Sequence, residues 1–398
     1  MSHAIDRSRT TQRAFIGRVL VQMVSGDGVE PAELGPLVRG RDLTGVVEAA
    51  RYHRVVGWAY RALRDVPEVD PDVVGRLRDL HRASARNHLR VTVALTTIAA
   101  ALDEAGLRWL VFKGPVLSEC VYRAPELRLY RDLDLLVART DFATSLRVLQ
   151  GVGATLLDHN WPLIRRDGYG ELNLTDRFGT ALDLHWQLLF SQELRDAFPI
   201  PVDEVIERAD TVIVRGRSVR TLDPADTLMH LAFHAALAGG DRLIWLKDLE
   251  QSIRHREPDW DLVVHRSRAW RVQILVALML ERAQRTVDAR VPDGIVEALT
   301  PQRPWRVATA GLDRLFPSVH SRGGGNPARM VARTARGSPA ASAGNLGSVL
   351  GKRVLRLVRE RRWDLPETED DPSNPESVRY PAGAPGDLER YLEHVQRG

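Results

Sequence analysis

Residues 107–137 contain two apolar runs of strand length, and the second run carries two carboxylates. The first run, 107–112, is followed by Lys113-Gly114-Pro115, where glycine permits a turn and proline suits the start of a helix. The second run begins Asp132-Leu133-Asp134. Because side chains alternate along a strand, both aspartates share one face and the leucines take the other. The segment predicts a strand, a turn, a helix, a basic loop and a second strand.

This segment also has the chemistry of a nucleotide site. The free backbone N–H groups after Gly114 would favour a phosphate, with Lys113 as a point charge and Arg128 in the loop beyond. Asp132 and Asp134 repel each other unless a cation lies between them. Mg²⁺ binds one or two carboxylates together with substrate phosphates, so it is the simplest such cation. The alternative is that both aspartates lie on the solvated face of an edge strand.

A third carboxylate follows in residues 171–189, which read as a hairpin of two alternating runs. In its second run Asp183, His185 and Gln187 share one face. If this strand lies beside the first, Asp183 joins the aspartate pair, either as a metal ligand or as the acceptor of a hydroxyl proton. The alternative for Asp183 is an exposed strand residue.

The chain resembles the bacterial family of uncharacterised nucleotidyltransferases, relatives of the polymerase-β type. The residues that carry the resemblance are Lys113-Gly114, Tyr122, Arg128, Asp132-x-Asp134-Leu135-Leu136-Val137 and Asp183-x-His185-Trp186.

The resemblance implies that Asp132 and Asp134 hold Mg²⁺ and that Asp183 completes a catalytic triad. In the mechanism that we expect, the three catalytic aspartates hold two Mg²⁺ ions. We expect Lys113, Gly114, Arg128 and His185 to bind the nucleotide, an NTP donor that is expected to be ATP. Lys113-Gly114 stands where the wider superfamily has Gly-Ser or Gly-Gly. The resemblance names no acceptor.

Composition limits the remaining classes. The net charge of +4 in 398 residues does not require a nucleic-acid partner, and the single cysteine, Cys120, excludes an internal disulfide. Only three of the 56 basic residues are lysines, Lys113, Lys247 and Lys352, so a lysine at the phosphate turn suggests that a compact ammonium is needed there. The longest apolar run, residues 91–102, is too short to span a bilayer. A soluble, cytoplasmic protein without membrane contact is expected.

The fold class expected is α+β, a small mixed sheet forming a nucleotidyltransferase core between two helical regions. The expected segments are an N-terminal helical region at 1–98, the core at 99–223, a C-terminal helical domain at 224–317, and a flexible linker and tail with short helices at 318–398. Within the core we expect a helix over 141–152 with Thr140 as N-cap, and a small hairpin over 211–219 that closes the sheet.

Two histidines of the C-terminal helical region, His230 and His234, are spaced i and i+4. This spacing suits zinc, but the sequence offers neither the glutamate of H-E-x-x-H nor a third ligand, so zinc is not predicted. The family resemblance extends to His234 and residues 242–249, which suggests a helical lid with His234 or Asp248 near the acceptor. The alternative is hydrogen bonding between helices.

The leading hypothesis is metal-dependent transfer of a nucleotidyl group from an NTP to a small molecule, peptide or protein. Two alternatives remain open. A glycosyltransferase also uses D-x-D, usually after a longer nucleotide-binding α/β unit, and it would release a nucleoside diphosphate instead of pyrophosphate. A catalytically idle nucleotide-binding scaffold, or an antitoxin-like partner, would transfer no label from any NTP.

Overall fold

The computed structural model describes residues 2–300, 311 and 386–397. The chain divides into two compact units, each made from three stretches of sequence. The first comprises Met1–His88, Leu117–Tyr130 and Thr227–Pro339. The second comprises Leu89–Val116, Arg131–Asp226 and Ala340–Gly398. Among the described residues all strands belong to the second, so we call the first the helical unit and the second the sheet unit.

Helices dominate the chain before the first described strand. They are α1 (Ser2–Val24), α2 (Pro31–Val38), α3 (Thr44–Tyr52), α4 (Val56–Leu63) and α5 (Pro71–Glu104). Prolines at the first positions of α2 and α5 suit helix starts, because proline lacks the N–H that a first turn leaves unpaired. In the helical unit, Gly57 of α4 lies against the 3-10 turn η1 (Pro125–Leu127), where a Cβ would come within 2.7 Å of the Leu127 Cα. Only glycine fits this contact.

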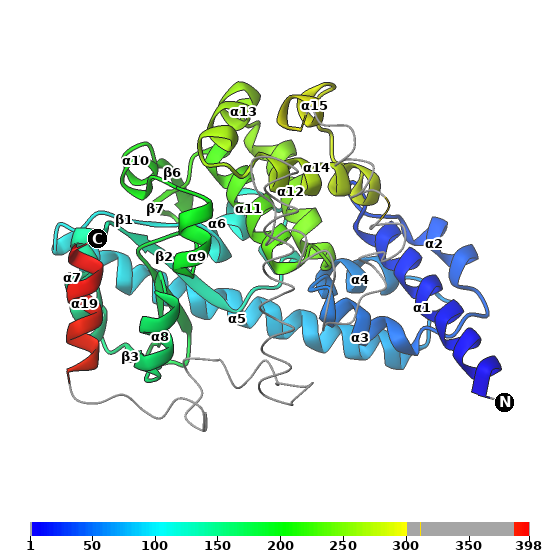
Figure 1. Ribbon diagram of the computed structural model, residues 1–398. Coiled ribbons are helices and arrows are strands. Elements are labelled where there is room, and N and C mark those ends of the chain that lie inside the picture. The colour runs from blue at the N-terminus through cyan, green and yellow to red at the C-terminus, as the bar shows by residue number, and fades with distance from the viewer. Residues whose placement is uncertain (1, 301–310, 312–385, 398) are drawn as a thin grey trace. The chain divides into compact units, whose positions relative to one another are not determined.

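The main sheet has five strands in the order β1-β2-β5-β4-β3. Figure 1 labels three of them, β1, β2 and β3. Their bounds are β1 (Trp109–Val111), β2 (Asp132–Val137), β3 (Thr155–Leu156), β4 (Glu171–Thr175) and β5 (Ala181–His185). Strands β2 and β5 are parallel, and the other neighbours are antiparallel. The leucines of β2, β4 and β5 are fully buried. The expected α+β class with a small mixed sheet is confirmed.

The hairpin expected over 211–219 is present, as β6 (Asp210–Val214) and β7 (Arg217–Thr221). Its turn residues Arg215 and Gly216 both have positive φ, 50° and 78°, as a tight hairpin turn requires. The hairpin forms a separate two-stranded sheet with β7 against β1, so the expectation that it closes the main sheet is wrong.

The remaining described helices connect or follow the strands. They are α6 (Gly114–Cys120), η2 (Arg139–Asp141), α7 (Phe142–Gly151), α8 (Trp161–Asp167), α9 (Gln192–Ala197), α10 (Val202–Glu207), α11 (Pro224–Ala238), α12 (Leu243–Arg256), α13 (Trp260–Ala269), α14 (Gln273–Val287), α15 (Ile295–Leu299) and α19 (Asp387–Arg397). The helix expected over 141–152 is α7, but the predicted N-cap is wrong. Thr140 lies in η2, and its hydroxyl accepts a hydrogen bond from Arg108.

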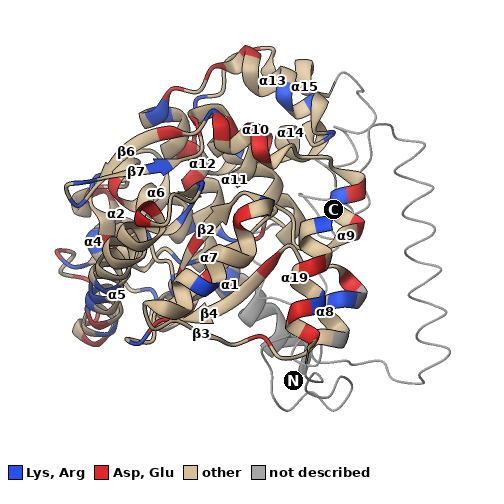
Figure 2. Ribbon diagram, turned by 90° about the vertical axis from the view of Figure 1, so that its left-hand side faces the viewer, with Lys and Arg blue, Asp and Glu red and all other residues tan. Residues whose placement is uncertain are grey.

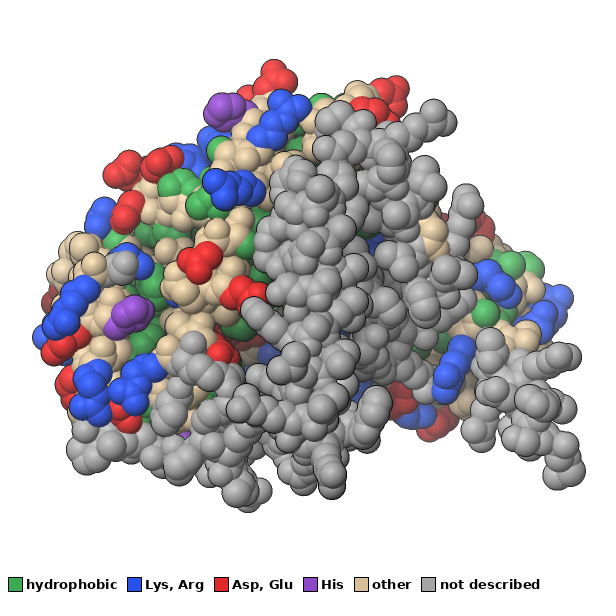
Figure 3. Space-filling model, in the orientation of Figure 1, with side chains coloured by type: hydrophobic (Ala, Val, Ile, Leu, Met, Phe, Trp, Pro, Cys, Tyr) green, Lys and Arg blue, Asp and Glu red, His purple; other side chains and the backbone are tan. Residues whose placement is uncertain are grey.

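Lys and Arg are interspersed with Asp and Glu on the described elements (Figures 2 and 3). On the described residues, these two views show no large area of one charge sign, which agrees with the net charge of +4. Within the described ranges, none of the helices has the length and apolar character to cross a bilayer. Most of the linker and tail expected at 318–398 lies outside the described residues, and the segment bounds expected from sequence remain predictions.

The last described helix, α19, packs on α7 and α8 within the sheet unit (Figure 1). The Tyr391 side chain is 1% exposed. Its hydroxyl accepts a hydrogen bond from Trp186 Nε1 at 3.0 Å and donates one to the Tyr169 carbonyl at 2.8 Å. Trp186 directly follows β5. This helix therefore supports the end of the strand that carries Asp183 and His185.

We expect Tyr391→Phe to lower the free energy of unfolding by about 1–3 kcal/mol, because the buried Trp186 N–H and Tyr169 carbonyl each lose a partner. Urea denaturation followed by tryptophan fluorescence and circular dichroism measures this change. The exposed Gln396→Ala on the same helix is the control, with a change within about 0.5 kcal/mol. Equal stability of Tyr391→Phe and wild type would show that this contact does not secure α19.

Candidate metal centre and nucleotide site

Asp134 and Asp183 lie directly opposite each other on the parallel strands β2 and β5. Residues paired in this way project from the same face of the sheet. His185 lies two residues after Asp183 on that face. One ligand atom from each of Asp134, Asp183 and His185 lies within 4.8 Å of the other two, and among the described residues this is the one group of three with that property.

Asp132, the other predicted ligand on β2, is paired with Ala181 and does not belong to this group. It is partly exposed at the start of the strand. Its charge still acts on both Asp183 and Lys113. The structure thus brings together two of the three predicted carboxylates with His185, and metal binding by Asp132 remains a prediction.

A glutamate that sequence analysis did not select orients His185. Glu171 on β4 lies opposite His185 on β5, and its Oε2 is 3.0 Å from His185 Nδ1. The other ring nitrogen, Nε2, is buried and has no hydrogen-bond partner within the described residues. It is 3.6 Å from Asp134 Oδ1, longer than a hydrogen bond. The alternation of residues 171–175 could have revealed Glu171, since it faces the same way as Asn173 and hence as Asp183.

Lys113 supplies the positive charge nearest to Asp134. Its Nζ lies 2.8 Å from Asp134 Oδ1, and the side chains are 16% and 4% exposed. Gly114 follows with φ of 49°, a left-handed conformation that favours glycine. The helix after it, α6, has only seven residues, so its dipole is weaker than a longer helix would provide. Lys113 is therefore the main group of this turn that could attract phosphate.

Burial and the neighbouring charges shift the pKa values of Asp134, Asp183 and His185. Although burial alone would raise it, the Lys113 and His185 charges hold the pKa of Asp134 far below its usual range. Burial and the neighbouring Asp134 charge raise the pKa of Asp183 to about 8. Burial opposes the imidazolium of His185, but the Glu171 charge and the contact with Asp134 outweigh it and raise its pKa to about 10. The site has more carboxyl groups than compensating cations.

These residues fit a divalent cation. Two carboxylates and a buried imidazole nitrogen converge, with Glu171 fixing the ring as carboxylates do behind metal-bound histidines. A metal bound at His185 Nε2 would displace the proton of the imidazolium. Burial and the neighbouring Asp134 charge raise the pKa of Asp183, and a further cation between the two carboxylates would offset that repulsion. The donor set admits Mg²⁺ or Mn²⁺ through its oxygens, and its nitrogen suits softer ions.

Arg128, predicted to bind phosphate, belongs to the helical unit, where it forms a buried ion pair with Asp248. Arg128 Nε donates to Asp248 Oδ1 at 2.8 Å, and Nη2 donates to Oδ2 at 3.0 Å. Tyr122 also donates to Asp248 Oδ1, at 2.6 Å. This network favours the hydrogen-bonding role for Asp248 over a contact with the acceptor. It also occupies two donors of the Arg128 fork, whose phosphate contact remains a prediction.

The rings of His230 and His234 stack with centroids 5.7 Å apart. The rings of His234 and Trp245 are T-shaped, with centroids 6.4 Å apart. Neither histidine belongs to the group of three potential ligands found in the described residues. The structure therefore adds no third ligand that would favour zinc there.

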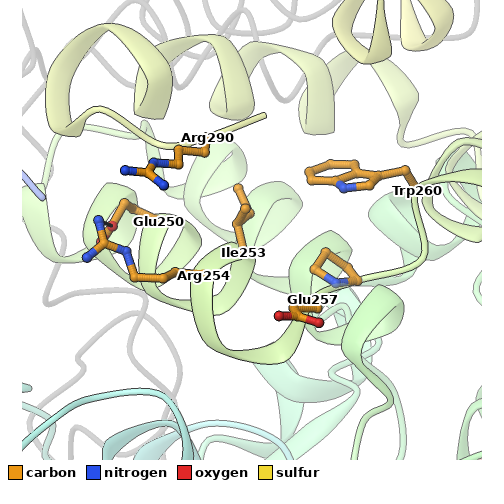
Figure 4. A pocket seen from close by; sticks show the side chains of 7 residues that line it. Glu250, Ile253, Arg254, Glu257, Trp260 and Arg290 are labelled. Atoms are coloured by element: carbon orange, nitrogen blue, oxygen red, sulfur yellow. Dashed lines mark ion pairs between the residues drawn. The ribbon is translucent and has the colours of Figure 1, made fainter. Parts of the chain in front are cut away.

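A separate pocket of about 440 Å³ lies in the helical unit (Figure 4). Its lining residues are Glu250, Ile253, Arg254, Glu257, Pro258, Trp260 and Arg290. In Figure 4, Arg254 and Arg290 lie at one end near Glu250, while Trp260 lies at the other. Arg254 Nη2 forms an ion pair with Glu250 Oε1 at 2.8 Å. None of the predicted site residues lines this pocket, so it is distinct from the candidate metal centre.

Comparison with known proteins agrees with the composition of this site. The family model described as uncharacterised nucleotidyltransferase matches residues 40–288, more than half of the chain. No curated protein matches the chain.

We expect Arg128→Met to lower the free energy of unfolding by about 3–5 kcal/mol, because the Asp248 charge would remain buried without a cation beside it. Adding Asp248→Leu should recover most of that loss, since no buried charge is then left unpaired. Denaturant titration of both variants measures this, with the exposed Arg131→Met as control from the same loop. An Arg128→Met protein as stable as wild type would contradict a structural role and leave the guanidinium for phosphate.

Proposed function

The chain belongs to the uncharacterised nucleotidyltransferase family, and from this premise we propose that it transfers a nucleotidyl group from an NTP to an acceptor hydroxyl or phosphate. The observation that carries the proposal is the convergence of Asp134, Asp183 and His185 on one face of the sheet, with Lys113 beside them. In this reaction an acceptor oxygen attacks the α-phosphorus. A new oxygen–phosphorus bond forms, the bond to the β-phosphate breaks, and pyrophosphate leaves.

We assign Asp132, Asp134 and Asp183 to two Mg²⁺ ions, with His185 as a further ligand. Bound divalent ions would supply charge stabilisation to the attacking and leaving oxygens. Asp183 would hold an ion or accept the proton of the acceptor hydroxyl. Lys113 would balance phosphate charge, and positioning and electrostatics of this kind provide most of the catalysis in phosphoryl transfer.

We propose that the donor is ATP and that the acceptor is a small molecule, peptide or protein. We further propose that the reaction takes place in the cytoplasm. Gly114 would let the backbone approach the phosphates, as its left-handed φ permits without strain. The bulk charge gives no support to a nucleic-acid acceptor, since the excess is only +4.

We expect Asp134→Asn and Asp183→Asn each to reduce transfer at least about a hundredfold, because each removes a charge that would hold the ion at the reacting phosphate. The assay incubates the protein with each α-phosphate-labelled NTP, Mg²⁺ or Mn²⁺ and cell extract, and follows labelled product and pyrophosphate. Asp196→Asn, an exposed carboxylate in the same unit, is the matched control.

Unchanged transfer in either variant would remove that residue from the mechanism. Release of a nucleoside diphosphate in place of pyrophosphate would favour a glycosyltransferase. Nucleotide binding by the folded wild type, with no label transferred from any NTP, would favour the idle scaffold or the antitoxin-like partner.

Glu171→Gln provides an independent test of His185 as a ligand. The substitution keeps the size of the side chain but removes the carboxylate that fixes the ring, so we expect Mn²⁺ affinity to fall about tenfold to a hundredfold. Electron paramagnetic resonance of free Mn²⁺ measures this, with Glu193→Gln, an exposed residue of the sheet unit, as control. If both variants bind Mn²⁺ equally well, Glu171 does not orient a metal ligand.

A further inference from the structure

Asp134 is the most enclosed carboxylate of the metal group, and a protein cation already lies on it. Asp134 is 3% exposed, and its Oδ1 is 2.8 Å from Lys113 Nζ. His185 Nε2 lies 3.6 Å from the same oxygen. The ammonium thus occupies one of the positions around this oxygen from which a divalent ion would be bound.

We propose that Lys113 is an internal counter-ion of Asp134 that competes with the divalent cation and exchanges onto the phosphates when a nucleotide binds. This inference rests on the proposed function. Metal binding to the free protein is then weak, and the nucleotide strengthens it by drawing Lys113 away from Asp134. Lys113 acts as a positioning residue that makes metal loading depend on the nucleotide.

The two cations beside Asp134 differ in their freedom to move. His185 is held on one side by Glu171, at 3.0 Å, and on another by the edge of the Phe112 ring, with centroids 5.1 Å apart. Lys113 is joined to the backbone by a flexible four-carbon stem, and any of its three donors can be turned toward an acceptor. Its ammonium also lies over the Phe112 ring, 5.2 Å from the centroid. Of the two, Lys113 is therefore the one suited to exchange partners while its backbone stays in place.

Charge provides the driving force for the exchange. The charges of Asp132, Asp134 and Glu171 all act on Asp183, and the charges of the three aspartates act on Lys113. A triphosphate brings a high negative charge of its own, so it attracts the ammonium, while Asp134 gains the divalent ion in return. The coupling is reciprocal: a nucleotide that strengthens metal binding is itself bound more tightly when metal is present.

The residue type agrees with this role. Lysine is rare in the chain, at three of 56 basic residues, so a position filled by lysine is an exception to its general use of arginine. Arginine would bind a carboxylate with a planar, two-pronged fork, which is harder to release than a single ammonium. Lysine is therefore the better residue for a contact that must be broken in each cycle.

The test measures Mn²⁺ binding to the full chain by electron paramagnetic resonance, with and without α,β-methylene-ATP. For Lys113→Met without nucleotide we expect Mn²⁺ affinity to rise at least about tenfold, since a like charge within hydrogen-bond distance of the ligand is removed. In wild type the analogue should raise Mn²⁺ affinity beyond its own chelation of the ion, measured without protein. In Lys113→Met that extra gain should be lost, and the analogue should bind more weakly.

Two further variants separate charge from shape. Lys113→Gln keeps a hydrogen-bond donor without the charge and should behave as Lys113→Met does. Lys113→Arg keeps the charge and should bind Mn²⁺ as weakly as wild type. Thermal melts by circular dichroism report whether each variant folds.

Unchanged or weaker Mn²⁺ binding by folded Lys113→Met and Lys113→Gln overturns the proposal, and so does the unfolding of both, which would make Lys113 a structural residue. Failure of the proposed function looks different. In that case the wild-type protein binds no Mn²⁺ even in the presence of the analogue. Alternatively, it binds Mn²⁺ and the analogue but transfers no label from any α-phosphate-labelled NTP.

Discussion

Two carboxylates that face each other across a parallel strand pair impose the main constraint on the sheet unit. Asp134 and Asp183 are paired on β2 and β5, where like charges repel and burial strengthens the repulsion. Cations from neighbouring positions offset it: Lys113 follows β1, and His185 lies on β5 with Glu171 on β4 behind it. Each of the adjacent strands β1, β2, β5 and β4 therefore carries, or is followed by, a charged residue of this site.

Strand register makes this arrangement specific. The leucines that alternate with the acidic residues are fully buried, so a slip of one residue would exchange the carboxylates for leucines on the working face. At the end of β5 the buried Trp186 is held by Tyr391 of α19, a helix more than 200 residues further along the chain. Apolar packing and this hydrogen bond thus fix the strand on which Asp183 and His185 depend.

Local sequence predicted the elements that carry the site, because alternation and the glycine turn are properties of short segments. It identified β2, the hairpin of β4 and β5, and the shared face of Asp183 and His185. It did not fix the pairing of β2 with β5, which joins residues about fifty positions apart. With that pairing, the three potential metal ligands that lie close together are Asp134, Asp183 and His185, and Asp132 is not among them. The register of the hairpin places Glu171 beside His185.

Arg128 shows why motif residues near each other in sequence can have different physical roles. A basic residue four positions before Asp132 suggested phosphate binding, but its partner Asp248 lies 120 residues away, where no local pattern could reveal it. A guanidinium buried against a carboxylate is costly to separate. The Lys113 ammonium, on a flexible stem, has its ion pair with Asp134 and also lies over the Phe112 ring. The same positive charge is therefore held by a two-pronged buried ion pair at one position, and at the other it is the charge that we propose to exchange.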